Sequence, residues 1–525
     1  MTAAALPLSV DQDRYRFKYI IAITVSLASV LELLDTSIVN VAIPHMMGNL
    51  GATLDQIAWV STGYIVANVI VLPITGWLSA YFGRRKYFAG SIALFTIASF
   101  LCGNAGSLEA LVFWRIVQGL GGGALLSTSQ AILYEEFPRE EYGTAMAIFG
   151  VGVMVGPTLG PTVGGWITDM YGWPWIFYIN IPFGMLALAL TLSFINDSRH
   201  QQRSESVDFI GLGLLAVGIG ALQTMLERGE RLDWWASGQV RLLGITSALA
   251  LIAFIWHELR TEHPVVDLRI LKSRQLAVGV VFGLVLGICL YATVFVLPVY
   301  LQNIRNFTAN QTGLVILPGA LASAFTMAVM GRTTGKFDAR LSIVAGVSIF
   351  ALSMWKHAHF TTDSGMSDFF WPLIFRGVGL GLIFVPLTNL ALSDLPMSKI
   401  PNGTGLFNLM RQLGGSVGIA ISATLLQRFT AIHRADLAAN VTPYAEATRE
   451  RLGQISQALI ARGEVPAIAQ TKAVGFLNGI VTRQAMMLSF EQLFLLFGAV
   501  FVVSLALLPL MHKSKGMPGA GAAAH

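Results

Sequence analysis

Long apolar stretches, separated by short polar segments, recur along the whole chain. A transmembrane helix needs about 20 mostly apolar residues, because each residue advances it by about 1.5 Å through a hydrocarbon core about 30 Å thick. Fourteen stretches meet this length and predict an all-α polytopic membrane protein. The predicted spans are 19–43, 55–79, 87–105, 107–130, 142–167, 174–195, 207–227, 240–258, 275–301, 311–332, 341–358, 368–393, 402–428 and 486–510.

The composition agrees with this fold class. Hydrophobic residues make up 54% of the 525 residues and charged residues only 12%, whereas about 25% of an ordinary soluble domain is charged. The net charge of +5 would suit a nucleic-acid-binding protein, but the basic residues are scattered over short loops, which membrane topology explains better. Because the two cysteines lie in separate apolar stretches, they predict neither a disulfide framework nor a metal site.

The distribution of lysine and arginine predicts the orientation in the membrane. An even number of spans places both termini on the same side. Lysine and arginine are concentrated in the N-terminal tail and in alternate short loops, as is typical of cytoplasmic loops. On the other side, many of them lie in the long connection at about 430–485, and long loops contribute little to this rule. We therefore expect a multi-pass protein of the bacterial inner (cytoplasmic) membrane with both termini in the cytoplasm.

The two halves of the chain resemble each other. Gly76–Arg85, after the second span, is similar to Gly331–Arg340, after the tenth, and Arg115 in the fourth span has a counterpart in Arg376 in the twelfth. This repeat predicts two six-helix bundles with two extra spans between them. It can be a purely structural duplication, but parallel repeats also surround the midplane site of transporters that rock between two states. The predicted units are residues 1–200, the two linker helices at 201–260, and 261–525 with the long loop at about 430–485.

Two carboxylates interrupt the first apolar stretch. An Asp at the centre of a membrane helix costs about 2.5–3.5 kcal/mol on insertion scales, so Glu32 and Asp35 need an explanation. They are three residues apart and share one helix face, together with Thr36 and Asn40. One interpretation is a polar face packed inside a helix bundle. The other is a proton-carrying site, because intramembrane acids mark proton and ion pathways, and we favour this second interpretation.

The fourth span contains an arginine, Arg115, followed by Gln118 and Gly119. A cation inside the hydrocarbon region faces the interior of the bundle and pairs with a partner. We expect Arg115 to favour the charged form of a facing carboxylate, Asp35 or Glu32, while burial opposes it. A conformational change that alters this balance would bind or release a proton. A static buried ion pair is the structural alternative.

Two further motifs concern helix packing and movement. In the fifth span glycines recur every fourth residue, which lets another helix approach closely, and two prolines bend the helix. These residues are Gly152, Gly156, Pro157, Gly160, Pro161, Gly164 and Gly165. In the loop after the second span, two glycines precede three cations, which anchor the loop in the cytoplasm. We expect Gly76, Gly83, Arg84 and Arg85 to take part in gating as well.

Several stretches together resemble one family. The loop 76–86 is similar to the loop signature of the major facilitator superfamily, in which an acid normally stands where this chain has Ala80, and the fifth-span motif resembles the antiporter signature of that superfamily. The stretches that narrow the resemblance to the fourteen-helix drug:proton antiporters of the EmrB/QacA type, and among them to the EmrB branch, are 35–44, 173–184, 226–234 and 263–274. The similarity extends from about residue 19 to about residue 510.

The resemblance implies the fold of that superfamily and a proton as the coupling ion, with no cofactor. It implies a role of Arg115 in proton transfer, and Asp35 is our first candidate for the proton carrier. Glu32 is not a fixed element of the family pattern, so it is a second protonatable site or a determinant for cationic substrates. The resemblance also implies that the 430–485 segment meets an EmrA-like periplasmic adaptor, which leads to a TolC-like outer-membrane channel; a floppy insertion is the alternative.

The sequence constrains the identity of the substrate less than it constrains the fold. Polar and aromatic residues in the spans could line a cavity, although aromatic residues in membrane helices more often only pack. Glu32 favours lipophilic cations, whereas Arg376 and Arg411 favour anionic or amphipathic acids, and the sequence decides neither. The candidates for the cavity are Asn40, Gln118, Trp371, Arg376, Phe384, Asn389, Phe407, Asn408, Arg411 and Gln412.

The leading hypothesis is a multidrug exporter that exchanges lipophilic or amphipathic compounds for protons by alternating access. The alternatives are a narrow exporter of a fatty acid, siderophore or other metabolite, and a ligand-sensing or assembly protein on a transporter scaffold. The sequence contains no Gly-x-x-x-x-Gly-Lys-Ser/Thr phosphate loop and no His-Glu-x-x-His zinc motif. Gly414–Gly418 matches the letters of a Gly-x-Ser-x-Gly elbow, but it lies inside a predicted membrane span and not at a strand-to-helix turn. ATP-driven transport, a metal site and an enzyme reaction are therefore unsupported.

Overall fold

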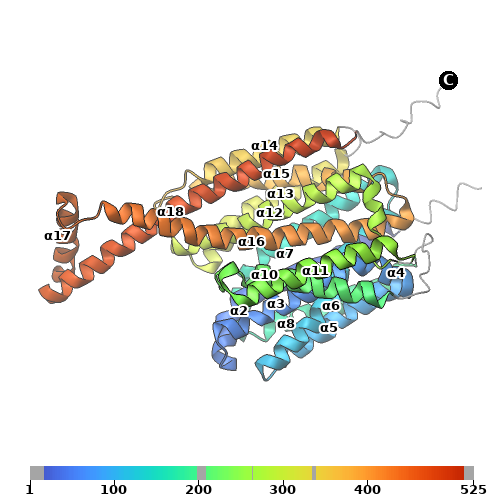
Figure 1. Cartoon of the computed structure of the whole chain (residues 1–525), viewed down its shortest axis with the longest axis horizontal. Helices are drawn as coiled ribbons and strands as arrows, with labels where there is room; N and C mark the ends of the chain where they lie inside the picture. The colour runs from blue at the N-terminus through green and yellow to red at the C-terminus, as the bar shows by residue number, and fades with distance from the viewer. Residues whose placement is uncertain (1–16, 198–207, 263, 334–337, 513–525) are drawn as a thin grey trace, which may run out of the picture.

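Helices account for all regular secondary structure in the part of the chain that the structure describes. The computed structural model describes residues 17–197, 208–262, 264–333 and 338–512. Most of the helices run side by side along the long axis of the molecule (Figure 1). Thirteen are long and apolar enough to cross a membrane, and α7 (Tyr142–Tyr171), which bends by 41° between Met154 and Leu159, brings the number to fourteen. The predicted fold class is confirmed.

The first six spans form the N-terminal half. Besides α7, their helices are α2 Lys18–Leu50, α3 Leu54–Val71 with η1 Leu72–Ile74 and α4 Thr75–Phe82, α5 Arg84–Gly103, α6 Leu108–Glu136, and α8 Trp175–Tyr178 with α9 Asn180–Phe194, while η2 Arg139–Glu141 precedes α7. α2 packs against α7, α3 packs against α6, and α5 packs against α6 and α9.

The C-terminal half repeats these pairings. Its helices are α12 Arg274–Asn303, α13 Ala309–Thr333, α14 Ala339–His357, α15 Met366–Leu392, α16 Ile400–Ala439 and α18 Pro466–Ser504, with η4 Leu268–Lys272, η5 Met397–Lys399 and η6 Leu505–Leu510 at their ends. α12 packs against α16, α13 against α15, and α14 against α15 and α18. The helix packing therefore shows the same repeat as the sequence. The domain boundary that we predict at residues 200 and 201 lies outside the described residues.

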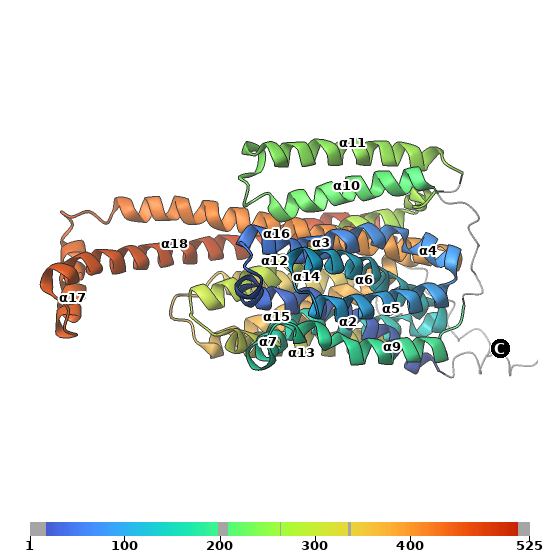
Figure 2. The same ribbon diagram turned by 90° about the horizontal axis from the view of Figure 1, so that it is seen from below.

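Two extra helices lie along one side of the bundle (Figure 2). These are α10 Phe209–Arg228 and α11 Gly238–Arg260, joined through η3 Trp234–Ala236. α10 touches α3 of one half and α16 of the other, and Gln223 Nε2 donates a hydrogen bond of 2.7 Å to Ser416 Oγ. α11 leaves large apolar side chains exposed, among them Leu242, Leu249 and Ile252, as a lipid-facing helix does.

The connection predicted as a long loop at about 430–485 is helical. α16 runs on to Ala439, α17 (Glu446–Ala461) follows, and α18 begins at Pro466. Both views show these helices projecting beyond the bundle with α17 at the tip (Figure 1 and Figure 2). We call residues 430–485 the extension. Hydropathy predicts only where a span turns polar, whereas α16 and α18 continue as helices beyond that point. Pro466 does not interrupt a helix here but starts one, since its missing N–H is not needed in the first turn.

The two halves meet closely at the end of the bundle opposite the extension. A Cβ atom added at Gly76 of α4 would lie 1.8 Å from Asn402 Oδ1 of α16, and one added at Gly331 of α13 would lie 2.6 Å from the Gly143 carbonyl oxygen of α7. Gly76 and Gly331 are equivalent positions of the sequence repeat. Each half thus contributes the same kind of contact to the interface at this end: a glycine of its second span packs against the fifth span of the other half.

Both ends of the described chain also lie at this end of the bundle. Lys18, at the start of α2, forms a 2.6 Å ion pair with Glu141, just before α7. Near the other terminus, Gln275 Nε2 at the start of α12 donates a 2.8 Å hydrogen bond to the His512 carbonyl oxygen. This arrangement agrees with an even number of spans.

The glycines of α7 bring it against α2, the helix that carries both membrane carboxylates. A Cβ atom at Gly156 would lie 2.8 Å from Leu33 Cβ, and one at Gly164 would lie 3.0 Å from the Ile38 carbonyl oxygen. These distances are too short for a side chain, so the glycine surface sets how close the two helices come. The position of Glu32 and Asp35 in the bundle therefore depends on the glycines of α7.

We predict that Gly156→Ala displaces α2, because the new methyl group would also lie 3.2 Å from the backbone nitrogen of Leu34, which cannot rotate away. Overpacking of this kind costs about 1–3 kcal/mol. The matched control is Gly165→Ala, whose methyl group would lie an ordinary 3.7 Å from Val41 Cγ1. Melting of the purified variants, followed by intrinsic fluorescence, checks the difference. Equal melting temperatures would contradict the prediction.

Candidate functional site

A buried ion pair lies inside the N-terminal half. Arg115 Nη1 of α6 lies 2.5 Å from Asp35 Oδ2 of α2, and the two side chains are 1% and 0% exposed. So far from water, each charge is tolerated only because the other compensates for its lost hydration. The structure brings together Arg115 and one of the two carboxylates that we proposed as its partner, and that partner is Asp35.

Neutral groups complete the coordination of this pair. Gln118 Nε2 and Asn180 Nδ2 donate hydrogen bonds of 3.0 and 2.9 Å to Asp35 Oδ1. Arg115 Nη1 also donates to Gln118 Oε1 at 2.7 Å, and the guanidinium lies 4.1 Å from the centroid of the Tyr64 ring. Three neutral side chains, from α3, α6 and α9, therefore surround the charge pair.

Glu32 lies one turn before Asp35 in a different environment. Its side chain is 2% exposed, and its Oε1 accepts a 3.0 Å hydrogen bond from Asn68 Nδ2 of α3. Its Oε2 is buried and has no hydrogen-bond partner among the described residues. An unsatisfied buried carboxylate oxygen is costly, and a proton on it would lower that cost. The two acids are thus distinct: Asp35 is fully paired and Glu32 is not.

A polar network in the C-terminal half links to the N-terminal half. Arg411 Nη2 donates to Asn408 Oδ1 at 3.2 Å, and its Nη1 lies 3.4 Å from Tyr291 Oη. Tyr291 Oη donates to Gln412 Oε1 at 3.3 Å, while Asn408 Nδ2 donates to Gln130 Oε1 of α6 at 2.6 Å. The structure therefore brings together three of the predicted candidates, Asn408, Arg411 and Gln412, on one buried network.

Arg376 of α15 lies on a pocket between α7, α12, α13 and α15, which Tyr291 of the Arg411 network also lines. Its side chain is only 7% exposed, and its Nε has no hydrogen-bond partner among the described residues. The structure thus places this predicted candidate on a cavity.

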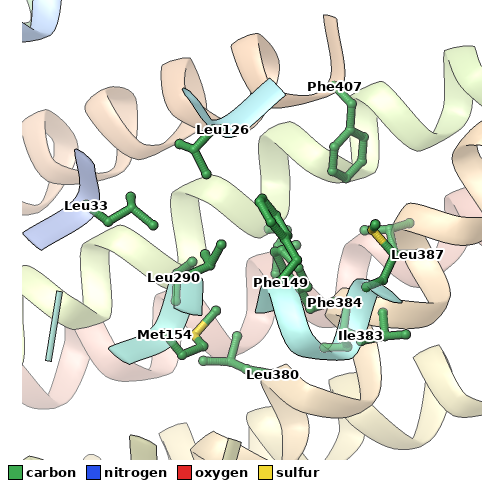
Figure 3. Close-up of a cluster of buried hydrophobic side chains, with 14 of the residues drawn as sticks. Leu33, Leu126, Phe149, Met154, Leu290, Leu380, Ile383, Phe384, Leu387 and Phe407 are labelled. Carbon is green, nitrogen blue, oxygen red and sulfur yellow. The ribbon is translucent and has the colours of Figure 1, made fainter. Parts of the chain in front are cut away.

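The two predicted phenylalanines belong to the apolar core rather than to an open cavity. Phe384 of α15 and Phe407 of α16 are 1% and 0% exposed. Figure 3 shows them within a cluster that also contains Leu33 and Phe149 of the N-terminal half. The cluster fills the space between the halves, so these two side chains help to close the interior in this conformation.

Three candidates lie away from the buried networks. Trp371 is 60% exposed, and its ring contacts Phe375, as a membrane-belt residue would. Asn40 is exposed, and its Oδ1 accepts a 3.1 Å hydrogen bond from Ser61 Oγ. Asn389 accepts a 2.8 Å hydrogen bond from Tyr134 Oη, which joins α15 to α6. The structure therefore does not place these three residues with Arg411 or Asp35.

The predicted gating loop is held by acids of α6 and by Asp197. Arg84 forms ion pairs of 2.6 and 3.1 Å with Glu135 and Glu136, and the backbone N–H of Arg85 donates to Asp197 Oδ1 at 3.0 Å. Gly83 has φ of 91°, a conformation that glycine adopts readily. In the family that the loop resembles, an acid normally stands at the position of Ala80. In this chain, these acids supply negative charge to the arginines of the loop instead. The loop is thereby fixed within its own half, and Gly76 makes the contact with the other half.

Sequence reasoning missed four partners of the predicted residues. Asn180 and Asn68 are the amide donors to Asp35 and Glu32, and Tyr291 and Gln130 connect the Arg411 network. Each is a polar residue inside an apolar span, which was the available signal. Such residues gain significance only when the fold shows which charge they face.

Taken together, two repeated six-helix halves with charged groups buried between their helices are typical of secondary transporters. In the described residues, no cluster of His, Cys, Asp and Glu side chains could hold a metal ion. The sequence profile of the Major Facilitator Superfamily matches residues 25–419. The chain belongs to this superfamily, so it is a transporter and not an enzyme, as predicted.

Individual relatives extend over nearly the whole chain. The fatty acid resistance protein FarB of Neisseria gonorrhoeae is 36% identical over 506 residues, which are 96% of this chain and 97% of that protein. The multidrug export protein EmrB of Escherichia coli K12 is 34% identical over 509 residues, 96% and 98% of the two chains. A crystal structure of the human organic anion transporter MFSD10 (TETRAN) has a TM-score of 0.61 at 13% identity, over 94% of this chain and 99% of that one.

We predict that Arg115→Gln destabilises the protein, because it leaves Asp35 buried without a cation. Breaking a buried pair from one side costs about 3–5 kcal/mol, and the double variant Asp35→Asn, Arg115→Gln should recover most of this loss. Thermal melting in detergent checks the double-mutant cycle, with Arg241→Gln on the exposed face of α11 as the control. A single variant as stable as the unmodified protein would contradict the role of the pair.

Proposed function

We propose that the protein is a proton-coupled multidrug antiporter that exports lipophilic or amphipathic compounds by alternating access. The observation that carries the proposal is the buried Asp35–Arg115 pair with its two amide donors. An intramembrane acid facing a cation is the arrangement of proton relays in transporters. The names of the relatives, EmrB for multidrug export and FarB for fatty acid resistance, support export and leave the breadth of the substrate range open.

The proposed proton cycle uses the separation of the ion pair. While Arg115 remains at Asp35, the cation compensates the buried carboxylate. When rocking of the halves moves Arg115 away, burial favours the protonated form, and Asp35 takes up a proton. One charge moving across 100 mV yields about 2.3 kcal/mol, which at about 1.4 kcal/mol per tenfold supports a roughly fifty-fold gradient of substrate.

We predict that Asp35→Asn abolishes export driven by a pH step in proteoliposomes, because an amide cannot carry the proton. The same variant should lose proton release on addition of substrate to the purified protein. Asp363→Asn, an exposed residue between α14 and α15, is the matched control and should export normally. Retained coupling in Asp35→Asn would overturn this assignment. Substrate binding without counterflow in the unmodified protein would favour a sensing function instead.

Glu32→Gln separates the two roles left open for the second acid. If Glu32 is a second proton site, the variant should release fewer protons per substrate for all substrates. If it recognises cationic substrates, only lipophilic cations should lose affinity. Glu109→Gln, exposed at the start of α6, is the control.

We further propose that the protein lies in the inner membrane with both termini in the cytoplasm, and that it is the inner-membrane part of a tripartite pump. The extension lies at the opposite end of the bundle from Lys18 and His512, so it would enter the periplasm. Its last helix exposes Val474, Phe476 and Ile480, and exposed apolar side chains outside the membrane commonly mark protein interfaces. An EmrA-like adaptor leading to a TolC-like channel is the proposed partner.

We predict that Phe476→Ser with Ile480→Ser weakens co-purification with an EmrA-like adaptor, because the two side chains are one turn apart on the same exposed face of α18. Export into proteoliposomes, which needs no adaptor, should be unchanged. Gln470→Ser on the exposed surface of the same helix is the control. Undiminished adaptor binding by the double variant would contradict this interface.

A further inference from the structure

The pocket on which Arg376 lies contains two polar groups without partners. Arg376 Nε and Ser323 Oγ are both buried and have no hydrogen-bond partner among the described residues, and the two side chains are 7% and 2% exposed. Both residues line the same pocket. An arginine remains charged in proteins, so this cation lacks the compensation that Arg115 receives from Asp35. The pocket thus presents positive charge and hydroxyl donors to whatever enters it.

The internal repeat shows that Arg376, in the described part of the chain, lacks the carboxylate partner that its counterpart Arg115 has. Arg376 corresponds to Arg115, 261 residues earlier, in the same span of the other half. The helix α2, which carries Asp35, corresponds to α12, the first span of the C-terminal half. α12 contains no Asp or Glu, and it lines the Arg376 pocket with Leu290, Tyr291 and Val294. The C-terminal half therefore keeps the arginine of the ion pair, but the helix equivalent to α2 supplies no carboxylate to it.

We propose that this pocket is a binding subsite for the carboxylate of an amphipathic acid, which takes the place of the missing side-chain carboxylate. The proposal rests on the proposed export function and names one substrate class for it. Arg376 forms the ion pair with the ligand, and Ser323 Oγ donates a hydrogen bond to it. Arginine suits this role because its planar guanidinium matches the geometry of a carboxylate.

The rest of the pocket favours an acid with an apolar tail over an inorganic anion. Its other walls include Val153, Leu290, Val294 and Leu380, which offer no hydrogen bonds to a strongly hydrated ion. The cavity volume is about 40 Å³, enough for about three ordered waters at 10–15 Å³ each. The head group therefore fits in this conformation, and the tail has to lie along the apolar surfaces of α7 and α12 as the halves part.

Three twelve-carbon probes that differ in head-group charge test the subsite: dodecanoate, dodecanol and dodecyltrimethylammonium. Binding to the purified full-length protein in detergent is measured by isothermal titration calorimetry. Arg376→Gln should weaken dodecanoate binding at least tenfold and leave the other two probes unchanged. Arg376→Lys should lose less, since it keeps the charge but not the planar fork. Arg241→Gln, an exposed arginine of α11, is the matched control.

A second measurement separates binding from folding. Ligand-free Arg376→Gln should melt no lower than the unmodified protein, because it removes an unpaired buried charge, and dodecanoate should raise the melting temperature of the unmodified protein only. Wild-type dodecanoate affinity in Arg376→Gln, equal loss of all three probes, or no dodecanoate binding to the unmodified protein would overturn the proposal. These measurements need no proton gradient, so their outcome is distinct from failure of proton-driven export.

Discussion

Burying Asp35 and Arg115 among apolar helices requires that the two charges stay together, because either charge alone would lack compensation for its lost hydration. Much of the N-terminal half follows from this requirement. α2 and α6 must approach at the level of the pair, and α9 must supply Asn180 to the same carboxylate. The glycines of α7 determine where α2 lies and therefore where the carboxylate lies. Helix packing and electrostatics thus constrain the same residues, and a change in one alters the other.

The two halves repeat the same helix packing, but they do not repeat the same charge pairing. Each half pairs its first span with its fifth and its second with its fourth. Only the N-terminal half pairs its fourth-span arginine with an acid. In the described part of the C-terminal half, Arg376 and Arg411 form no ion pair, and Arg411 has only neutral hydrogen-bond partners. A proton site in one half and an anion-binding surface in the other would let proton and substrate act on different elements of a single rocking movement.

The sequence predicted the fold well because a membrane constrains it strongly: each span must be long, apolar and helical. The pairing of Arg115 with a carboxylate could also be predicted, since a cation in hydrocarbon requires a partner. The sequence predicted the extension as a long loop, and it did not predict that the extension is helical, because the polar helical residues there lack the hydropathy signal. Phe384 and Phe407 could not be distinguished from cavity residues, because an aromatic residue in a span has the same sequence signal whether it packs or lines a pocket. The uncompensated state of Arg376 depends on which side chains lie around it, and sequence alone does not contain that information.

The free energy of the polar contacts between the halves is similar to the energy that a coupling ion can supply. Asn408 with Gln130, Thr404 with the Ser127 carbonyl oxygen and Tyr134 with Asn389 form hydrogen bonds of 2.6, 3.2 and 2.8 Å across the interface. Each contributes about 0.5–1.5 kcal/mol net, so the three together contribute about as much as one or two protons moving across 100 mV, at about 2.3 kcal/mol each. The apolar cluster of Figure 3 buries more surface. In the proposed rocking movement, however, the opposite end closes as this one opens, so only the difference between the two closed ends would oppose the movement. An interface of short polar contacts and glycine surfaces is therefore compatible with a cycle that a proton gradient can drive.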